Sequence, residues 1–531
     1  MLVPLLALIA IAARGSGPLW PHLISYVLPQ AALQTALLLC GTGVLVVAIG
    51  TGTAWLVSAY RFPGRSVLAW VLLLPLAMPA YIVAYAYLDV LHPAGTWQSW
   101  LRDALDLSLP LPDIRSLGGA VFLFGFVLYP YVYGTARASF LMQSADVLEA
   151  ARLDGASGGH LFRYIALPLA RPAIAAGAGL ALMETLGDIG ACEFLGVQTL
   201  TVSVYVTWVT RGSVEGAAQI ALAMLVPVAL LLLLERRSRP GRAEAGEITS
   251  ILSARPLGRV AGALAAAACA VPVILGFVAP ALHLALSSWS RIAEHGLSGR
   301  FVESALSSAQ YATIAAILAV AAGFALACCQ RFQRVGTPLR LVQIGYALPG
   351  TVIAVGLLGV LSAVDAAIGL IGIEALRGAL LLASPAAVIL AYLARFLAVP
   401  ASAIEAGYEK LPFSMDDAAR VSGARQASIA FHIHWPLLRP ATRAAFLVVF
   451  VECIKELPAT LLLRPLNTET LATFLYGEAS RGVYEDGAVA ALAMVGLGML
   501  PILLLSQPSR RPSATRASPA VPPAPDTRPA P

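Results

Sequence analysis

Five charged residues lie within apolar stretches and are the strongest candidates for chemistry in this chain. They are Glu184, Asp188, Glu452, Lys455 and Glu456. Burying a charge in lipid is costly, so such residues usually face a cavity or a partner. Glu184 and Asp188 are four residues apart and share a helix face, as do Glu452 and Glu456. Carboxylate oxygens suit a hard cation, whereas Lys455 paired with a carboxylate would lock neighbouring helices. Both interpretations remain open.

Other reactive residues occur without the context that their chemistry requires. Residues 155–159 fit the G-x-S-x-G nucleophile pattern but interrupt a loop, where no strand-turn-helix is expected. The six cysteines show no metal-site spacing, which favours packing roles. His432 and His434 have no third ligand nearby in the sequence, and no metal site is predicted. Lys410 and Lys455, the two lysines, neither follow Gly nor precede Ser or Thr, so this chain has no Walker A loop.

The elements that carry the charged residues are expected to be membrane helices. The chain is 59% hydrophobic and 12% charged, with a mean hydropathy of +0.79, whereas a soluble domain has about 25% charged residues. Apolar stretches that suit a hydrocarbon core of about 30 Å recur along the chain. They fall at residues 2–13, 32–59, 66–91, 117–136, 173–190, 216–234, 258–287, 304–329, 339–361, 378–399, 441–457 and 487–505. The predicted fold is therefore all-α and polytopic, with about twelve transmembrane helices in two six-helix halves.

The two halves repeat one another, most clearly in a short polar segment. Residues 149–172 and 417–440 align without a gap and are identical at 10 positions. The similarity extends further, because Arg61 aligns with Arg331 and Glu184 aligns with Glu452. An internal duplication from about residue 31 to 505 explains this pattern.

Charge predicts which side of the membrane each loop occupies. With the N-terminus inside, the inside segments hold 25 of the 35 Lys and Arg, and the outside loops hold nine. This bias puts both copies of the repeated segment and both termini in the cytoplasm. The net charge of +6 thus reflects topology and requires no nucleic-acid partner. Residues 1–13 also fit a signal-peptide core. We favour a retained helix, because an even number of helices keeps both repeated segments on one side.

These observations divide the chain into five parts. The expected divisions are a first helix with a periplasmic loop (1–30), a first membrane domain (31–236), a cytoplasmic linker with the seventh helix (237–302), a second membrane domain (303–506) and a disordered cytoplasmic tail (507–531).

The repeated segment resembles the E-A-A loop through which the membrane domains of binding-protein-dependent ABC importers contact a cytoplasmic ATPase. Its small residues permit close approach to a partner, and its glycine can end a short helix with positive φ. The prolines that follow are expected to punctuate the start of the next helix, because proline lacks a donor. The resemblance assigns ATPase coupling to Glu149, Ala150, Ala151, Asp154, Gly155, Pro168, Asp417, Ala418, Ala419, Gly423 and Pro436. The second copy departs from the pattern at Asp417 and Ser422.

This resemblance implies a multi-pass permease of the bacterial inner membrane. Its implied partners are two cytoplasmic ABC ATPase subunits, a periplasmic solute-binding protein and the lipid bilayer. ATP would bind to the ATPase subunits, and this chain would hold no cofactor and catalyse no reaction. A secondary transporter is the alternative class, because many are twelve-helix duplications with intramembrane acids. Such a transporter has no reason to keep paired E-A-A loops.

Within the importer superfamily, the chain is most similar to fused, two-domain ferric iron permeases. Residues 79–85, 184–191, 198–200 and 455–460 carry this similarity. It implies ferric iron as the substrate, with thiamine, phosphonates or polyamines as alternatives within the same architecture. Oxygen ligands suit a trivalent cation. The residues implied to line its pathway are Tyr81, Tyr85, Glu184, Asp188, Tyr205, Glu452, Lys455 and Glu456.

Overall fold

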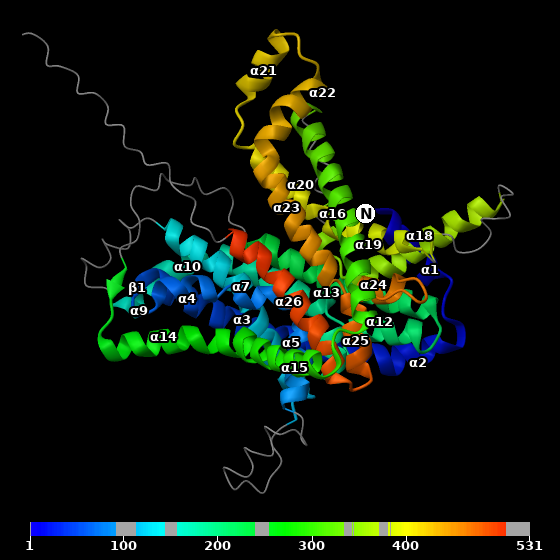
Figure 1. Ribbon diagram of the computed structural model, residues 1–531, viewed down its shortest axis with the longest axis horizontal. Helices are drawn as coiled ribbons and strands as arrows, with labels where there is room; N and C mark the ends of the chain where they lie inside the picture. Colours follow the sequence, from blue (N-terminus) through cyan, green and yellow to red (C-terminus); the bar gives the residue numbers. More distant parts are fainter. Residues whose placement is uncertain are drawn as a thin grey trace, which may run out of the picture.

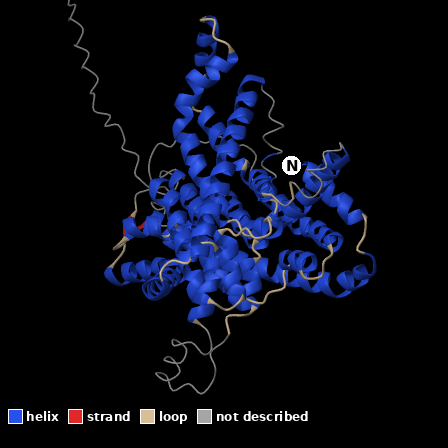
Figure 2. Ribbon diagram, turned by 45° about the vertical axis from the view of Figure 1, so that its right-hand side comes forward, coloured by secondary structure: helices blue, strands red, loops and turns tan. Residues whose placement is uncertain are grey.

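The computed structural model describes residues 2–91, 113–143, 157–238, 254–333, 342, 345–370, 381–382 and 384–505. Within this part of the chain nearly every element is a helix (Figure 2). The two strands, β1 (Tyr60–Arg61) and β2 (Arg255–Pro256), form one parallel pair. The expectation of an all-α membrane fold is therefore confirmed.

The first half begins with α1 and ends with α13. Its helices are α1 (Leu2–Ala13), α2 (Trp20–His22), α3 (Leu28–Ala59), α4 (Arg65–Val71), α5 (Ala80–Val90), α7 (Leu117–Met142), α9 (Gly158–Leu161), α10 (Leu167–Gly187), α11 (Gly190–Phe194), α12 (Leu200–Val209) and α13 (Val214–Ser238). Short 3-10 or π turns join or extend them at Gly17–Leu19, Leu23–Val27, Leu74–Ala77 and Phe162–Ala166.

The second half repeats the order of the long helices. Its helices are α14 (Arg259–Val273), α15 (Ala279–His295), α16 (Gly299–Gln333), α18 (Gly350–Leu370), α19 (Pro385–Phe396), α20 (Ala398–Tyr408), α21 (Phe413–Val421), α22 (Gln426–Ser428), α23 (Trp435–Lys455), α24 (Pro458–Leu463), α25 (Leu471–Ser480) and α26 (Tyr484–Leu505). Two π turns, Ile274–Val278 and Ile429–His434, lie within long helical stretches.

The number of clear membrane spans is lower than the twelve expected from the sequence. The described residues contain eight helices that are long and apolar enough to cross a membrane, or up to ten if each of two bent pairs forms one span. The other two expected spans are α1 and α23. With 12 residues, α1 is about 18 Å long, shorter than a hydrocarbon core of about 30 Å. In α23, four charged residues lower the hydropathy, namely Arg439, Arg443, Glu452 and Lys455.

One expected span, residues 66–91, is sharply broken. The segments Arg65–Ala77 and Ala80–Val90 meet at 90°. Pro79 forms the N-cap of α5, and Met78 before it is extended, with φ −110° and ψ 115°. The residue before a proline avoids the helical region, so the break follows from the local sequence. The bend places the start of α5 in the interior of the molecule, where Tyr81 is buried.

The prolines Pro168 and Pro436 mark the starts of the next helices, as expected, although the helical path continues through them. Pro168 and Pro436 lie in the first turns of α10 and α23, and both helices continue from a preceding π turn. A proline lacks the donor for the usual helical hydrogen bond. The wider π turn accommodates that loss without ending the helix.

Helices from the start of each half pack against the other half as well as against their own. Helix α1 packs against α18 of the second half, and α15 packs against α5 of the first. A Cβ atom added at Gly356 of α18 would collide with the carbonyl oxygen of Pro4, so the two backbones touch there. Small residues at such crossings allow helices in a membrane to approach closely. The halves therefore interlock.

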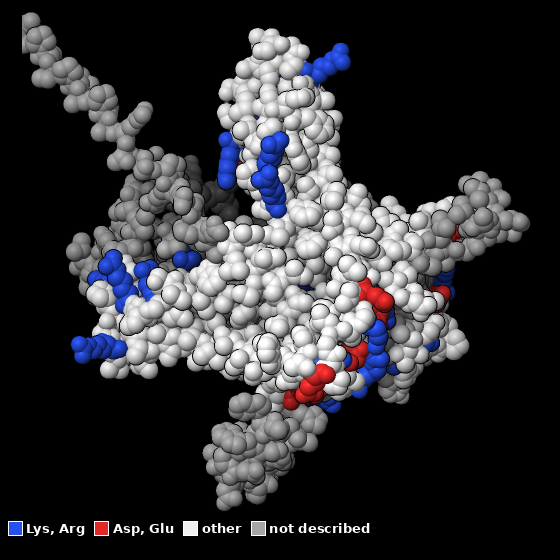
Figure 3. Space-filling view, viewed as in Figure 1, with Lys and Arg blue, Asp and Glu red and all other residues white. Residues whose placement is uncertain are grey.

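Three helices of the second half form a projecting arm. Figure 1 shows α16, α20 and α23 packed together and ending at α21 and α22, whereas α9 and β1 lie at a separate end of the molecule. We call α16, α20 and α23 the second-half arm. Basic side chains are visible on this arm and near β1, while the visible acidic side chains gather on the lower face (Figure 3). Arg300 forms ion pairs with Glu469 and with Glu478 of α25. These described acidic residues are far from α21.

Candidate functional site

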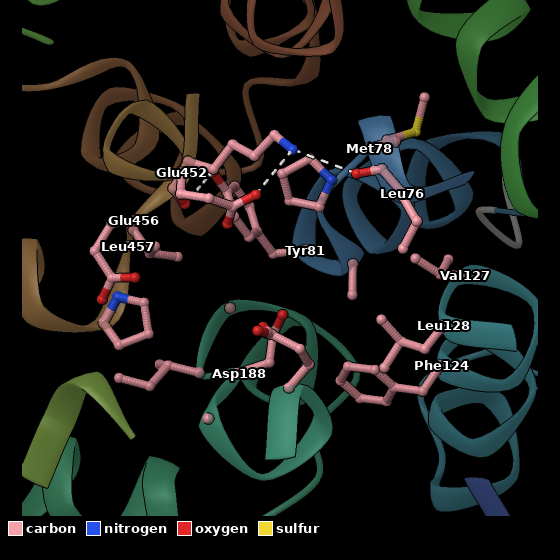
Figure 4. Close-up of a pocket in the computed structure, with 18 of the residues that line it drawn as sticks. Leu76, Met78, Tyr81, Phe124, Val127, Leu128, Asp188, Glu452, Glu456 and Leu457 are labelled. Carbon is pink, nitrogen blue, oxygen red and sulfur yellow. Dashed lines mark hydrogen bonds and ion pairs between the residues drawn. The ribbon is translucent and has the colours of Figure 1, made fainter. Parts of the chain in front are cut away.

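A small cavity between the halves collects most of the predicted pathway residues. Its volume is about 100 Å³, and Figure 4 shows α5, α10 and α23 meeting around it. Six of the eight predicted residues line it: Tyr81, Glu184, Asp188, Glu452, Lys455 and Glu456. Residues more than 250 positions apart in the sequence thus share one site. Their role in transport stays a prediction.

Repeat symmetry explains how two of the carboxylates are held. Helices α10 and α23 each end beside the cavity, and each is followed by a short helix, α11 or α24. Asp188 Oδ1 accepts a hydrogen bond of 2.7 Å from the Ala191 amide. Glu456 Oε1 accepts one of 3.1 Å from the Ala459 amide. Acceptors at a helix start satisfy free amide groups. Asp188 and Glu456, at equivalent positions of the two halves, therefore each accept a backbone hydrogen bond at the start of a short helix.

Two cations neutralise carboxylates contributed by the second half. Arg395 Nη1 lies 2.9 Å from Glu456 Oε1, and both side chains are largely buried. Lys455 Nζ lies 3.8 Å from Glu452 Oε1 and donates to the Leu76 carbonyl at 3.3 Å (Figure 4). These contacts tie α23 to α19 and to the chain before α5. They are the kind of contact expected for the helix-locking interpretation.

The carboxylates of the first half have no such partner among the described residues. Among the described residues, no Lys, Arg or His side chain forms an ion pair with Glu184 or Asp188. Both nevertheless line the cavity. All four carboxylates line the cavity, and Glu452 and Glu456 also pair with cations, so both the lining and the locking interpretations stay predictions.

Sequence reasoning missed Arg395 and Tyr131, which also line the cavity. Arg395 falls within the expected span 378–399, but sequence reasoning assigned it no place in the pathway. It lies near the end of α19 and is buried against Glu456. The signal was available, because Arg395 follows an apolar run in a predicted helix. An intramembrane cation implies a buried counter-charge.

Two predicted pathway residues lie elsewhere. Tyr85 is buried against α26, where a Cβ atom added at Gly487 would collide with its hydroxyl. Tyr205 packs edge-on against Tyr476 at 6.1 Å between ring centroids. Neither residue lines the cavity. Tyr85 comes four residues after Tyr81, so it lies about 6 Å further along α5. This distance is enough to place it outside so small a cavity.

The second copy of the repeated segment forms a distinct exposed helix, α21. Asp417 and Ala418 are exposed on it, and Ala419 is half-buried. Gly423 follows the helix with φ +83°, and its amide donates to the Arg420 carbonyl. The prediction that a glycine with positive φ ends this helix is confirmed for the second copy. In the first copy, Glu149, Ala150, Ala151, Asp154 and Gly155 lie outside the described residues.

A buried polar network anchors α21 to the second-half arm. Asp416, which is 3% exposed, accepts hydrogen bonds of 2.9 Å from both Arg331 Nε and His434 Nε2. Tyr408 contacts the other ring nitrogen of His434 at 3.2 Å. Burial alone raises the pKa of the Asp416 carboxyl, but the Arg331 and His434 hydrogen bonds outweigh burial and lower this pKa below its ordinary value. The first half aligns Leu148 with Asp416.

The same network gives His434 a structural partner in place of a metal. His434 is fully buried, whereas His432 is exposed and contacts the Ser428 carbonyl at 3.2 Å. The two histidines therefore occupy different environments. Within the described residues, no group of three or more His, Cys, Asp or Glu is placed to hold a metal ion.

Comparison with known proteins places these features in a family. Residues 46–243 match the family described as "Binding-protein-dependent transport system inner membrane component". The molybdenum transport system permease protein ModB of Escherichia coli is 31% identical over 204 residues, covering 36% of this chain and 86% of that protein. The Escherichia coli sulfate transport system permease protein CysW is 28% identical over 247 residues, covering 45% of this chain and 83% of that protein.

A third relative matches across both halves. The Fe(3+)-transport system permease protein FbpB 2 of Haemophilus influenzae is 23% identical over 485 residues, covering 89% of each chain. These relatives are permease subunits, and they favour the importer over a secondary transporter. The chain belongs to the inner-membrane components of binding-protein-dependent transport systems, and is an ABC importer permease with two membrane domains fused in one polypeptide.

Proposed function

We propose that this permease moves ferric iron, delivered by a periplasmic binding protein, across the bacterial inner membrane. The observation that carries the proposal is the cavity with four carboxylates, of which Glu184 and Asp188 face it without a described cation partner. Hard cations prefer oxygen ligands. The full-length similarity to an Fe(3+)-transport permease supports the same substrate.

Oxyanions are the second candidate substrate. Arg395 and Lys455 line the same cavity, and two of the relatives carry the names molybdenum and sulfate transport permease. In the present arrangement, however, each cation contacts a carboxylate. To bind there, an oxyanion would have to displace Glu452 from Lys455 or Glu456 from Arg395. We therefore place ferric iron first and use the oxyanions as competitors in the transport assay.

Energy would come from two ATPase subunits that bind the cytoplasmic segments around Glu149 and Asp417. Closure of the ATPases on ATP would draw these segments together, and the second-half arm, which includes α23, would move with them. Because α23 ends at the cavity, rigid-body motion of the arm would change access to it. In this scheme both termini are cytoplasmic, and the permease itself binds no nucleotide.

Neutralising the first-half carboxylates tests the proposed substrate pathway. We expect Glu184→Gln with Asp188→Asn to slow ferric iron uptake by about tenfold, an increase of about 1.4 kcal/mol in the barrier. The amount of assembled complex should stay unchanged, because neither residue has a described cation partner. Uptake of radioactive ferric iron by cells, measured beside membrane abundance, provides both values.

The matched control removes two exposed carboxylates, Glu294→Gln with Glu409→Gln, and should leave uptake unchanged. Loss of assembled protein in the Glu184 and Asp188 variant would assign these residues to helix locking. If excess molybdate or sulfate is taken up by the unmutated system while ferric iron is not, the iron assignment is wrong.

The two coupling segments should contribute unequally. Asp417 is 70% exposed in its side chain and contacts only Arg420, at 3.6 Å, among the described charged residues. We expect Glu149→Ala to reduce uptake more than Asp417→Ala, because the first copy retains Glu149 and Asp154 for charge-assisted contacts of about 1.5–3 kcal/mol each. Uptake rates normalised to membrane abundance provide the comparison. Equal losses in both variants would show that the departures in the second copy are immaterial.

A further inference from the structure

Two tyrosines from opposite halves of the permease meet near the cavity. Tyr205 of α12 and Tyr476 of α25 each lie six residues after the threonine that caps their helix, Thr199 or Thr470, so they are equivalent in the repeat. Their rings pack edge-on, with 6.1 Å between the centroids. Equivalent residues that contact one another lie near the axis that relates the two halves. A substrate that passes between the halves would follow this axis.

One carboxylate joins the two tyrosines. Glu193 of α11 accepts a hydrogen bond of 2.5 Å from the Tyr476 hydroxyl, a length typical of a charge-assisted bond. The aligned residue of the second half is Leu461, so only the first half supplies an acid here. Among the described residues, no Lys, Arg or His forms an ion pair with Glu193, and Arg464, whose charge reaches this cluster, pairs with Glu469 at 3.7 Å. We call Glu193, Tyr205 and Tyr476 the outer cluster.

The outer cluster comes directly after the cavity along the chain. Helix α10 begins within the first repeated segment and ends at the cavity, and Gly190 at the start of α11 lines the cavity. Glu193 follows three residues later, about 4.5 Å further along α11. Figure 1 shows α12 and α25 on the side of the molecule away from α21. With the repeated segments in the cytoplasm, the outer cluster therefore lies on the periplasmic side of the cavity.

The three side chains supply oxygen ligands that suit a trivalent iron ion. Hard cations prefer carboxylate oxygen, and tyrosine oxygen ligates iron in proteins. Burial raises the pKa of both phenols, and the Glu193 carboxylate raises it further, so both hydroxyls keep their protons in the absence of a metal ion. A ligand must lose its proton to bind a metal. The outer cluster should therefore favour a strongly acidic trivalent cation over monovalent and divalent ones.

We propose that the outer cluster is an entry site, at which the Glu193 carboxylate and the two phenolates bind ferric iron before it reaches the carboxylates of the cavity. Two protons, one from each tyrosine hydroxyl, would leave to water as the ion binds. Because the tyrosines come from opposite halves, separation of the halves would break the ligand set and release the ion. This inference rests on the ferric iron assignment made above.

A ferric phenolate absorbs visible light, which gives a readout that is independent of transport. The full-length permease with its ATPase subunits is reconstituted in nanodiscs, without the binding protein, and titrated with ferric nitrilotriacetate. We expect a phenolate-to-iron charge-transfer band that Tyr205→Phe and Tyr476→Phe each weaken. Glu193→Gln should weaken ferric binding by more than about tenfold, because loss of even an outer partner of a metal ligand costs about 10–100-fold.

The matched control is Tyr26→Phe, which removes the hydroxyl of a tyrosine that is 70% exposed and should leave the band unchanged. Resonance Raman spectra of the unmutated complex identify phenolate ligands without any substitution, so a variant that fails to assemble does not decide the result. A band that survives both tyrosine substitutions would place the iron elsewhere and overturn the proposal.

Ferric iron uptake by the unmutated system separates this inference from the substrate assignment. Uptake of ferric iron without a phenolate band would overturn the outer cluster as an iron site and leave the substrate assignment intact. Transport of molybdate or sulfate without any ferric iron uptake would overturn both.

Discussion

The Arg395→Met variant is expected to lower the free energy of unfolding of the permease by about 3–5 kcal/mol, the usual cost of removing one partner of a buried ion pair. Arg395 lies 2.9 Å from Glu456, and the two side chains are 12% and 4% exposed. Without the guanidinium group, a buried carboxylate beside the cavity loses its counter-charge. Thermal unfolding of the purified permease in detergent measures the loss, and uptake should fall with the amount of assembled protein.

Two controls identify the pair as the cause. Combining Arg395→Met with Glu456→Gln should recover much of the lost stability, because glutamine is neutral and can still accept the Ala459 amide hydrogen bond. Arg300→Met removes an exposed cation from Glu469 and Glu478 and should cost only about 0–1 kcal/mol. If the Arg395 and Arg300 variants lose equal stability, the Arg395–Glu456 pair does not lock α19 to α23.

The Gly423→Val variant is expected to abolish substrate-stimulated ATP hydrolysis while the permease stays in the membrane. Gly423 has φ +83°, a conformation that costs an L-residue about 1–2 kcal/mol, and valine adds β-branching. Relief of this strain would reorient the end of α21, where Val421 is 90% exposed and Asp417 is also exposed. The repeat predicts the same result for Gly155→Val. Purified complexes with their ATPases provide the measurement.

A glycine in a similar conformation serves as the control for backbone strain. Gly15 has φ +75° and, like Gly423, has no neighbouring atom within 4 Å of an added Cβ. Gly15→Val should therefore carry a comparable local cost and keep ATP stimulation. Normal stimulation in both the Gly155 and Gly423 variants would overturn the assignment of the repeated segments to coupling.

Local chemistry made several features predictable from the sequence. Long apolar stretches identify α3, α7, α16 and α26, because the length needed to cross a bilayer is a property of each segment alone. Gly423 was recognised as a helix end because only a residue without Cβ adopts positive φ without strain. The duplicated segment determined the repeat and, through resemblance, the family. Glu184 and Glu452, which align in the repeat, were therefore expected to occupy equivalent positions in the two halves.

The tertiary structure decided which of these residues meet and which charges cancel. Arg395 and Glu456 are separated by 61 residues, and no pattern in either helix indicates the pairing. It depends on how α19 packs against the end of α23. On a helix inferred from the sequence, Tyr81 and Tyr85 are equally good candidates for the pathway. The 90° bend before α5 leaves only Tyr81 at the cavity. Sequence determines which segments become helices because apolar length and turn preference are local, whereas buried charge pairs and cavities arise only when distant helices pack together.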